Sequence, residues 1–236
     1  MPTKCTKHPV SAKSTPSPDA MDALPPSLVH PLRGGFLSRY KAFVFDFDGT
    51  LYDYKHLKIN VIKNRPLDFF NVKAEGEVRR ELKGKWFASP QAFRGEQLRL
   101  LRAKRGFPSD ESALAWYDQF VWGMIDVLRQ KYTARPFARP LLRVLKEAGK
   151  TVAVFSDYWH VKERMEAIGL GCEAQDGTVD FMTSGEELGG LKPSREAFLA
   201  VASMAGCLPS EVVVFGDRED TDGEGAARAG MGFVKV

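Results

Sequence analysis

Short apolar runs alternate along the chain with segments of helical periodicity. Three runs are nearly continuous in apolar residues, namely Lys41–Phe47, Thr151–Phe155 and Val212–Phe215. Such runs are typical of strands that a parallel sheet buries on both faces. Each run stops at a small polar residue, an aspartate or a glycine. The runs Phe181–Thr183 and Gly232–Val236 predict two further short strands.

Helical segments precede the second and third of these apolar runs. The segment Arg139–Ala148 ends before Gly149, and the segment Ser194–Ala205 has a capping serine at its start and Gly206 at its end. The repeated alternation of strand and helix predicts an α/β fold, a Rossmann-like parallel sheet with helices on both faces. In such a sheet the carboxyl ends of the strands lie along one edge.

The stretch between Tyr54 and Tyr132 contains no strand-like run and shows helical periodicity instead. Ser89 and Pro90 predict a helix start, Gly106 predicts a helix end, and apolar residues recur every three or four positions further on. We therefore expect an inserted helical cap at residues 54–132, within a core made of residues 37–53 and 133–236. Residues 1–36 hold seven of the fourteen prolines and no periodicity, which predicts a disordered tail.

Composition and net charge indicate which kinds of binding partner to expect. The 236 residues are 44% hydrophobic, enough for a buried core, and the formal net charge is only +4. Fourteen Lys or Arg and five Asp or Glu lie between Tyr54 and Arg105, so the cap is the basic part. We interpret most of these charges as solvated helix faces, and the alternative is that some of them attract an anionic substrate. We expect neither nucleic acid nor membrane as a partner. The sequence does not predict an oligomeric state.

The cellular location is predicted from targeting and membrane-spanning signals that the sequence does not show. No apolar stretch reaches the length of a membrane span, and the cysteines show no Cys-x-x-Cys spacing for a zinc cluster. The first 32 residues contain no arginine and no clear amphipathic helix, so a transit peptide is not favoured, although the basic, acid-poor start leaves that alternative open. The expected location is cytoplasmic.

Polar side chains follow the three long apolar runs at the point where each strand ends. Asp46 and Asp48 close the first run, and Ser156 with Asp157 follows the second. The third is followed by three acids, Asp217, Asp220 and Asp222. Because parallel strands end along one edge, we expect these groups to converge. Clustered carboxylates repel each other unless a cation neutralises them, and Mg²⁺ is the oxygen-preferring cation expected here.

The order of these motifs resembles the haloacid dehalogenase superfamily of hydrolases, most of whose members are Mg²⁺-dependent phosphatases. The resemblance covers residues 41–236 apart from the insertion. It rests on four motifs in the family's order, Asp46-Phe47-Asp48-Gly49-Thr50, Ser156, Lys192 and Gly216-Asp217-Arg218-Glu219-Asp220-Thr221-Asp222. The inserted helices resemble the family's cap only in position and character.

The resemblance implies a role for each motif residue. Asp46 would be the nucleophile that forms an aspartyl-phosphate, and Asp48 would be the general acid and base, with its backbone carbonyl also reaching the metal. Ser156 would bind a phosphoryl oxygen, and Lys192 would offset negative charge. Asp46, Asp48 and Asp217 would hold the metal; whether Asp220 or Asp222 supports it stays open at this point.

The leading functional prediction is a Mg²⁺-dependent phosphatase acting on a small phosphorylated metabolite. A phosphoglucomutase-type phosphotransferase would retain the same four motifs, so it remains an alternative. Members of the family that act as dehalogenases typically lack the aspartate at position 48, which disfavours that activity. A non-catalytic binding protein with the same fold is a further alternative, although the intact Asp46 and Asp48 argue against it.

Aromatic cap residues are candidates either for the core of the cap or for the lining of a pocket, namely Trp86, Phe87, Trp116, Tyr117 and Trp122.

Overall fold

A five-stranded parallel sheet forms the centre of the protein. The computed structural model describes residues 35–236, and the sheet has the order β3-β2-β1-β4-β5. Its strands are β1 (Ala42–Phe45), β2 (Thr151–Ser156), β3 (Phe181–Ser184), β4 (Val212–Gly216) and β5 (Gly232–Lys235). The register pairs Phe45 with both Val154 and Phe215, so the carboxyl ends of the three central strands are level. The predicted α/β fold is confirmed, including the two shorter strands.

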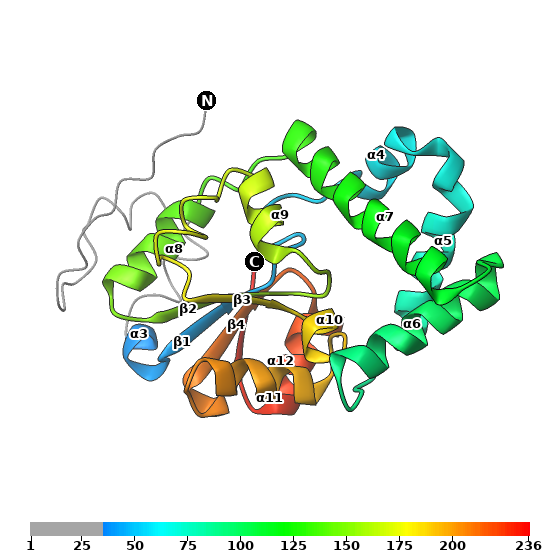
Figure 1. Cartoon of the computed structure of the whole chain (residues 1–236). Coiled ribbons are helices and arrows are strands. Elements are labelled where there is room, and N and C mark those ends of the chain that lie inside the picture. The colour runs from blue at the N-terminus through cyan, green and yellow to red at the C-terminus, as the bar shows by residue number, and fades with distance from the viewer. Residues whose placement is uncertain (1–34) are drawn as a thin grey trace.

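One set of helices covers both faces of the sheet, and a second set forms a separate layer beyond the carboxyl ends of the strands (Figure 1). The helices around the sheet are α3 (Phe36–Arg39), α8 (Ala138–Glu147), α9 (Val161–Ala167), α10 (Gly185–Leu188), α11 (Arg195–Met204), η2 (Pro209–Glu211), η3 (Glu219–Gly223) and α12 (Glu224–Ala229). The separate layer contains α4 (Leu57–Asn64), η1 (Pro66–Asp68), α5 (Phe69–Leu82), α6 (Pro90–Arg105) and α7 (Asp110–Lys131), which we call the cap helices.

Alternate residues of each strand enter two different apolar clusters. Phe43 and Phe45 of β1 face the cluster that contains α8 and α9, whereas Ala42 and Val44 face the cluster that contains α11 and α12. All four side chains are fully buried, which explains the continuous apolar runs in the sequence. The same burial on both faces leaves only the ends of the strands available for polar chemistry.

The cap helix α6 begins and ends where its sequence predicts. The Ser89 hydroxyl accepts a hydrogen bond from the Ala92 amide at 3.1 Å at the start of α6, and Gly106 ends that helix in the left-handed region. The long helix α7 buries Tyr117, Val121 and Leu128, as its periodicity indicates. Within residues 35–236, no helix is both long and apolar enough to cross a lipid bilayer.

The predicted tail falls almost wholly outside the described residues. Of positions 1–36 only Gly35 and Phe36 are described, and Phe36 begins α3. Its ring lies 4.8 Å from that of Tyr40 and 6.2 Å from that of Phe43. The described chain therefore starts as a short helix packed beside the sheet. The division into core and cap at residues 53/54 and 132/133 stays a prediction.

The cap also contacts the core through the loop between α5 and α6, away from the two places near residues 54 and 132 where the chain passes between core and cap. The loop between α5 and α6 lies against Gly189 and Gly190, where the Phe87 amide donates to the Gly189 carbonyl at 2.9 Å. A side chain at position 190 would come within 2.8 Å of the Trp86 ring, so only glycine allows this approach. Lys192 follows two residues later, and the loop bearing it is thus part of the cap contact.

Candidate active site

The carboxyl ends of β1, β2 and β4 form the floor of the candidate site. Asp46 follows β1, Asp217 follows β4, and Ser156 is the last residue of β2. The chain turns sharply after β1, with Gly49 at a φ of 91°. A Cβ atom at position 49 would lie 2.3 Å from Asp217 Oδ2, so a glycine is required for this loop to pass the second carboxylate.

Lys192 connects two carboxylates that are distant in the sequence. Its ammonium group donates to Asp46 Oδ1 and to Asp222 Oδ1, each at 2.7 Å. The remaining oxygen of Asp46, Oδ2, accepts a hydrogen bond from the Thr50 hydroxyl at 3.0 Å. All four residues are buried, and their hydrogen bonds therefore hold the Asp46 carboxyl group in one orientation.

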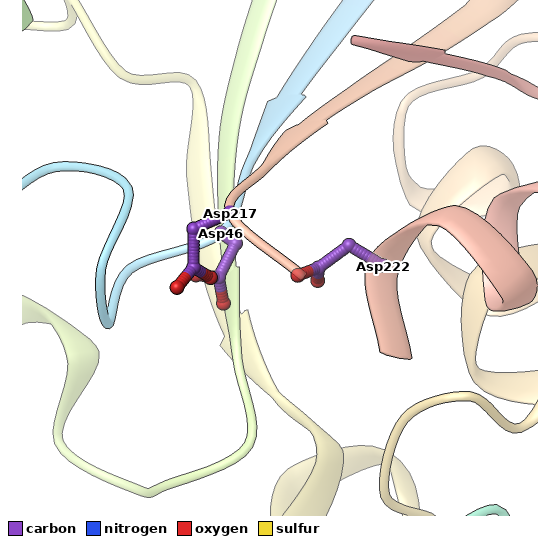
Figure 2. Close-up of side chains that lie close together, drawn as sticks. All are labelled: Asp46, Asp217 and Asp222. Carbon is purple, nitrogen blue, oxygen red and sulfur yellow. The ribbon is translucent and has the colours of Figure 1, made fainter. Parts of the chain in front are cut away.

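Three carboxyl groups lie close enough together to share a cation. One oxygen from each of Asp46, Asp217 and Asp222 lies within 4.8 Å of the others. Figure 2 shows Asp222 reaching toward Asp46 and Asp217 from its own segment of the chain. Asp217 Oδ1 is buried and has no hydrogen-bond partner among residues 35–236. An all-oxygen set with an unpartnered carboxylate oxygen fits a hard divalent cation such as Mg²⁺.

The electrostatics of this cluster point to the same conclusion. Burial is the main cause that raises the pKa of Asp46 to about 8; Lys192 opposes the shift, and the Asp222 and Asp48 carboxylates add to it. Burial and the nearby Asp222 also raise the pKa of Asp217. Lys192 alone cannot compensate for three carboxylates, and a bound cation would favour their ionised forms.

The Asp48 side chain lies outside this acidic cluster. It is hydrogen-bonded to Arg164, which the sequence analysis did not identify as a site residue. Both of its carboxylate oxygens accept hydrogen bonds from the Arg164 Nη2 group at 2.6 Å, and Tyr52 donates its hydroxyl to Oδ1. Arg164 also donates to the Ser156 hydroxyl at 2.8 Å and is fully buried, with its guanidinium carbon 4.4 Å from the centre of the Phe47 ring.

These contacts determine the charge on Asp48. Burial by itself would raise its pKa, but the Arg164 guanidinium and the hydrogen bonds from Arg164 and Tyr52 outweigh burial and hold the pKa below its usual value. Asp48 is therefore an anion near neutral pH, whereas the pKa of Asp46 without a metal lies well above its usual value. Two aspartates separated by a single residue thus have pKa values shifted in opposite directions, a common feature of catalytic carboxylate pairs.

The structure brings most of the sequence-predicted residues into one site but separates two groups of them. Asp46, Lys192 and Asp217 meet, and Asp222 joins them. Asp220 instead lies exposed in ion pairs with Arg218 and Lys83. The side chains of Asp48 and Ser156 contact Arg164, not the acidic cluster. The metal contact through the Asp48 backbone carbonyl and the phosphate contact of Ser156 stay predictions.

Arg164, Tyr52 and Thr50 are the site residues that the sequence reasoning did not identify. Thr50 belongs to the first motif, so its position was a usable signal. Arg164 lies in the first turns of α9, eight residues after Ser156, where a basic residue resembles any other charged helix position. Only its full burial distinguishes it, since an arginine is almost never fully buried without an anionic partner.

A cavity of about 290 Å³ lies between the strand ends and the cap helices. Its floor includes Asp46, Asp48, Asp217 and Asp222. On the cap side it is lined by five apolar residues, which we call the roof, Leu57, Val61, Val72, Phe120 and Met124. None of the five cap aromatics considered from the sequence lines this cavity; Trp116 and Tyr117 are buried in the cap, and Trp86 and Trp122 are partly exposed.

Comparison with known proteins identifies a family and a set of similar folds. A profile described as haloacid dehalogenase-like hydrolase matches residues 40–230. Over 101 residues the chain is 35% identical to a glyceraldehyde 3-phosphate phosphatase of Methanopyrus kandleri. That match covers 43% of this chain and 42% of the relative, so the chain spans less than half of the length of this relative.

Solved structures share the fold at lower identity. A predicted phosphoglycolate phosphatase of Haemophilus somnus superposes with a TM-score of 0.56 at 19% identity, over 83% of this chain and 84% of the other. A 2-haloacid dehalogenase of Pseudomonas syringae pv. Tomato superposes with a TM-score of 0.56 at 21% identity, over 82% and 85% of the two chains. At this level of identity both similarities concern the fold alone, and phosphatases and dehalogenases share it.

The match over residues 40–230 includes both the strand ends that carry the acidic cluster and the cap helices that close the cavity. The fold, the order of its motifs and the family profile agree, and the chain belongs to the haloacid dehalogenase-like hydrolases.

Proposed function

We propose that this hydrolase is a Mg²⁺-dependent phosphatase that acts on a small phosphorylated metabolite in the cytoplasm. The observation that carries the proposal is the position of Asp46, which is oriented by Lys192 and Thr50 beside two further carboxylates. The name of the Methanopyrus kandleri relative supports a phosphate ester as substrate.

In the proposed first step, an Asp46 oxygen attacks phosphorus while the bond to the leaving oxygen breaks, which gives an aspartyl-phosphate and an alcohol. Asp46, Asp217 and Asp222 would hold Mg²⁺, which when bound supplies positive charge against the phosphoryl oxygens. Lys192 already donates to Asp46 and would stabilise the added negative charge.

Asp48 would move the protons in both steps. In the first it would give a proton to the leaving oxygen, and in the second it would take a proton from the water that attacks the aspartyl-phosphate. The contacts with Arg164 favour the anion, which suits the second step. For the first step the Asp48 carboxyl group has to take up a proton before the alcohol leaves.

Hydrolysis of p-nitrophenyl phosphate tests this proposal. The full chain with Mg²⁺ should release p-nitrophenol, and both excess chelator and Asp46→Asn should abolish the release. Asp126→Asn is the matched control, because Asp126 is an exposed residue of α7 that pairs with the exposed Arg129 of the same helix. Wild-type turnover in Asp46→Asn, or turnover unaffected by chelator, would refute the proposed chemistry.

A further inference from the structure

The roof of the cavity differs sharply in chemistry from its floor. Leu57 and Val61 come from α4, Val72 from α5, and Phe120 and Met124 from α7. Apart from the weakly accepting sulfur of Met124, these side chains contain no hydrogen-bonding group. Four of the five are nearly completely buried, so they are held in place by the packing of the cap. Whatever is attached to the phosphoryl group on the cap side therefore meets hydrocarbon.

The polar groups next to the roof are already bonded to each other. Glu75 also lines the cavity, but its Oε1 accepts from Arg79 at 2.5 Å and its Oε2 accepts from the Tyr158 hydroxyl at 3.3 Å. The Arg79 guanidinium lies 3.4 Å from the centre of the Tyr158 ring and also pairs with Glu186. Each oxygen of Glu75 thus already accepts a hydrogen bond, and the Tyr158 hydroxyl already donates its proton within this buried network.

The remaining polar lining lies toward solvent or at the acidic floor. Lys58, Tyr54 and Arg218 are exposed residues of the lining, and their two cations suit the approach of a phosphate dianion. A hydroxyl group placed against the roof would lose its bonds to water and find no partner, which is costly. A sugar or polyol phosphate would place several hydroxyl groups there.

We propose that the substrate is a phosphate monoester of a small apolar alcohol, a short alkyl chain or a single ring, and that the roof selects it against polyol and sugar phosphates. A cavity of about 150 Å³ accommodates benzene, so 290 Å³ has room for a phosphoryl group and one ring. This inference rests on the proposed phosphatase function. It makes Val72, Phe120 and Met124 specificity-determining residues.

Binding of two phosphonates tests the inference independently of turnover, since phosphonates are not hydrolysed. Isothermal titration calorimetry with the Mg²⁺-loaded full chain should show benzylphosphonate binding at least about tenfold more tightly than 2,3-dihydroxypropylphosphonate, because each unpartnered buried hydroxyl costs roughly a factor of ten. Equal affinities, a preference for the diol, or no binding of benzylphosphonate would overturn the inference.

A variant of the roof links the preference to its residues. Met124→Gln introduces a carboxamide at similar side-chain length and should reduce the ratio of the two affinities by about threefold or more. Val72→Thr, which is nearly isosteric, is the second roof variant and should act in the same direction. Met204→Gln is the matched control, because Met204 is half-exposed on α11 and distant from the lining. An unchanged ratio in both roof variants would contradict the inference.

Parallel hydrolysis of benzyl phosphate and glycerol 1-phosphate separates this inference from the proposed function. Both are esters of primary alcohols, so their leaving groups need similar protonation. A binding preference for benzylphosphonate without turnover of either ester would support the apolar roof and contradict the phosphatase proposal. Turnover of both esters with equal kcat/KM, together with equal phosphonate affinities, would support the phosphatase and overturn the inference.

Discussion

The substitution Glu186→Gln should destabilise the protein strongly through the contact between cap and core. Glu186 lies in α10 of the core, and its carboxylate is fully buried among the cap helices. It accepts hydrogen bonds from Arg79 of α5 and Tyr117 of α7 through Oε1, and from Arg94 of α6 through Oε2 at 2.8 Å. One carboxylate of the core thus connects three cap helices.

The expected magnitude follows from what each partner retains. Removing one member of a buried ion pair costs about 3–5 kcal/mol because a charge is left without compensation. Arg79 keeps its pair with Glu75, and Arg94 keeps a hydrogen bond to the neutral Gln97 side chain and its contacts with the Tyr117 and Trp159 rings. We therefore expect the lower end of that range, about 3 kcal/mol. With a urea m-value of about 2 kcal/mol/M, the unfolding midpoint should fall by roughly 1.5 M.

Equilibrium urea unfolding of the full chain measures this effect by two signals. Three of the four tryptophans are Trp86, Trp116 and Trp122 of the cap, so fluorescence reports mainly on the cap, and circular dichroism reports on all helices. Glu187→Gln is the matched control, since Glu187 is the exposed neighbour and should change the free energy of unfolding by less than about 0.5 kcal/mol. A Glu186→Gln midpoint equal to that of the control would refute the reasoning.

Three further predictions concern residues of the candidate active site. Asp48→Asn should reduce kcat on alkyl phosphates by about a hundredfold or more and on p-nitrophenyl phosphate much less, because the activated leaving group needs little protonation; equal losses would contradict a general-acid role. Arg164→Met should lower the free energy of unfolding by about 3 kcal/mol or more, since Asp48 would lose its buried cation, and a midpoint shift near zero in urea unfolding would exclude this. In metal-free protein the contribution of Asp46 to stability should be lost as the pH rises from about 4 to about 8, because the pKa of Asp46 is raised to about 8 in the folded state and the unfolded chain gives up this proton earlier. Thermal unfolding of Asp46→Asn across that range should show a weaker dependence on pH, and an identical slope would rule out Asp46 as its source.

Local sequence predicted the strands, the helices α6, α7, α8 and α11, and part of the site. The apolar runs around Phe43, Ala153 and Val213 were typical of buried strands, and Ser89 and Gly106 indicated the ends of α6 through capping and backbone preference. Lys192 was identified only through the family resemblance, whereas Asp46 and Asp217 were found because strand ends of a parallel sheet meet along one edge. These inferences depend on properties of a residue and its near neighbours, which a sequence displays directly.

The choice between Asp220 and Asp222 required the tertiary structure. Both follow β4 within six positions, and sequence distance does not distinguish them. The irregular turn η3 directs Asp222 inward to Lys192 and leaves Asp220 at the surface with Arg218. Arg164 likewise acquires its role only when α9 packs on the sheet and brings a guanidinium to Asp48, 116 positions earlier in the chain.

The sequence by itself determined the α/β class, the inserted helices and the aspartate that we propose as nucleophile, because each follows from periodicity, capping or position relative to a strand end. The tertiary structure decided the partners of Asp48, the third carboxylate of the cluster and the apolar roof. Those features depend on side chains from separate helices meeting across the cavity, and helical periodicity indicates that a residue is buried without indicating what it is buried against.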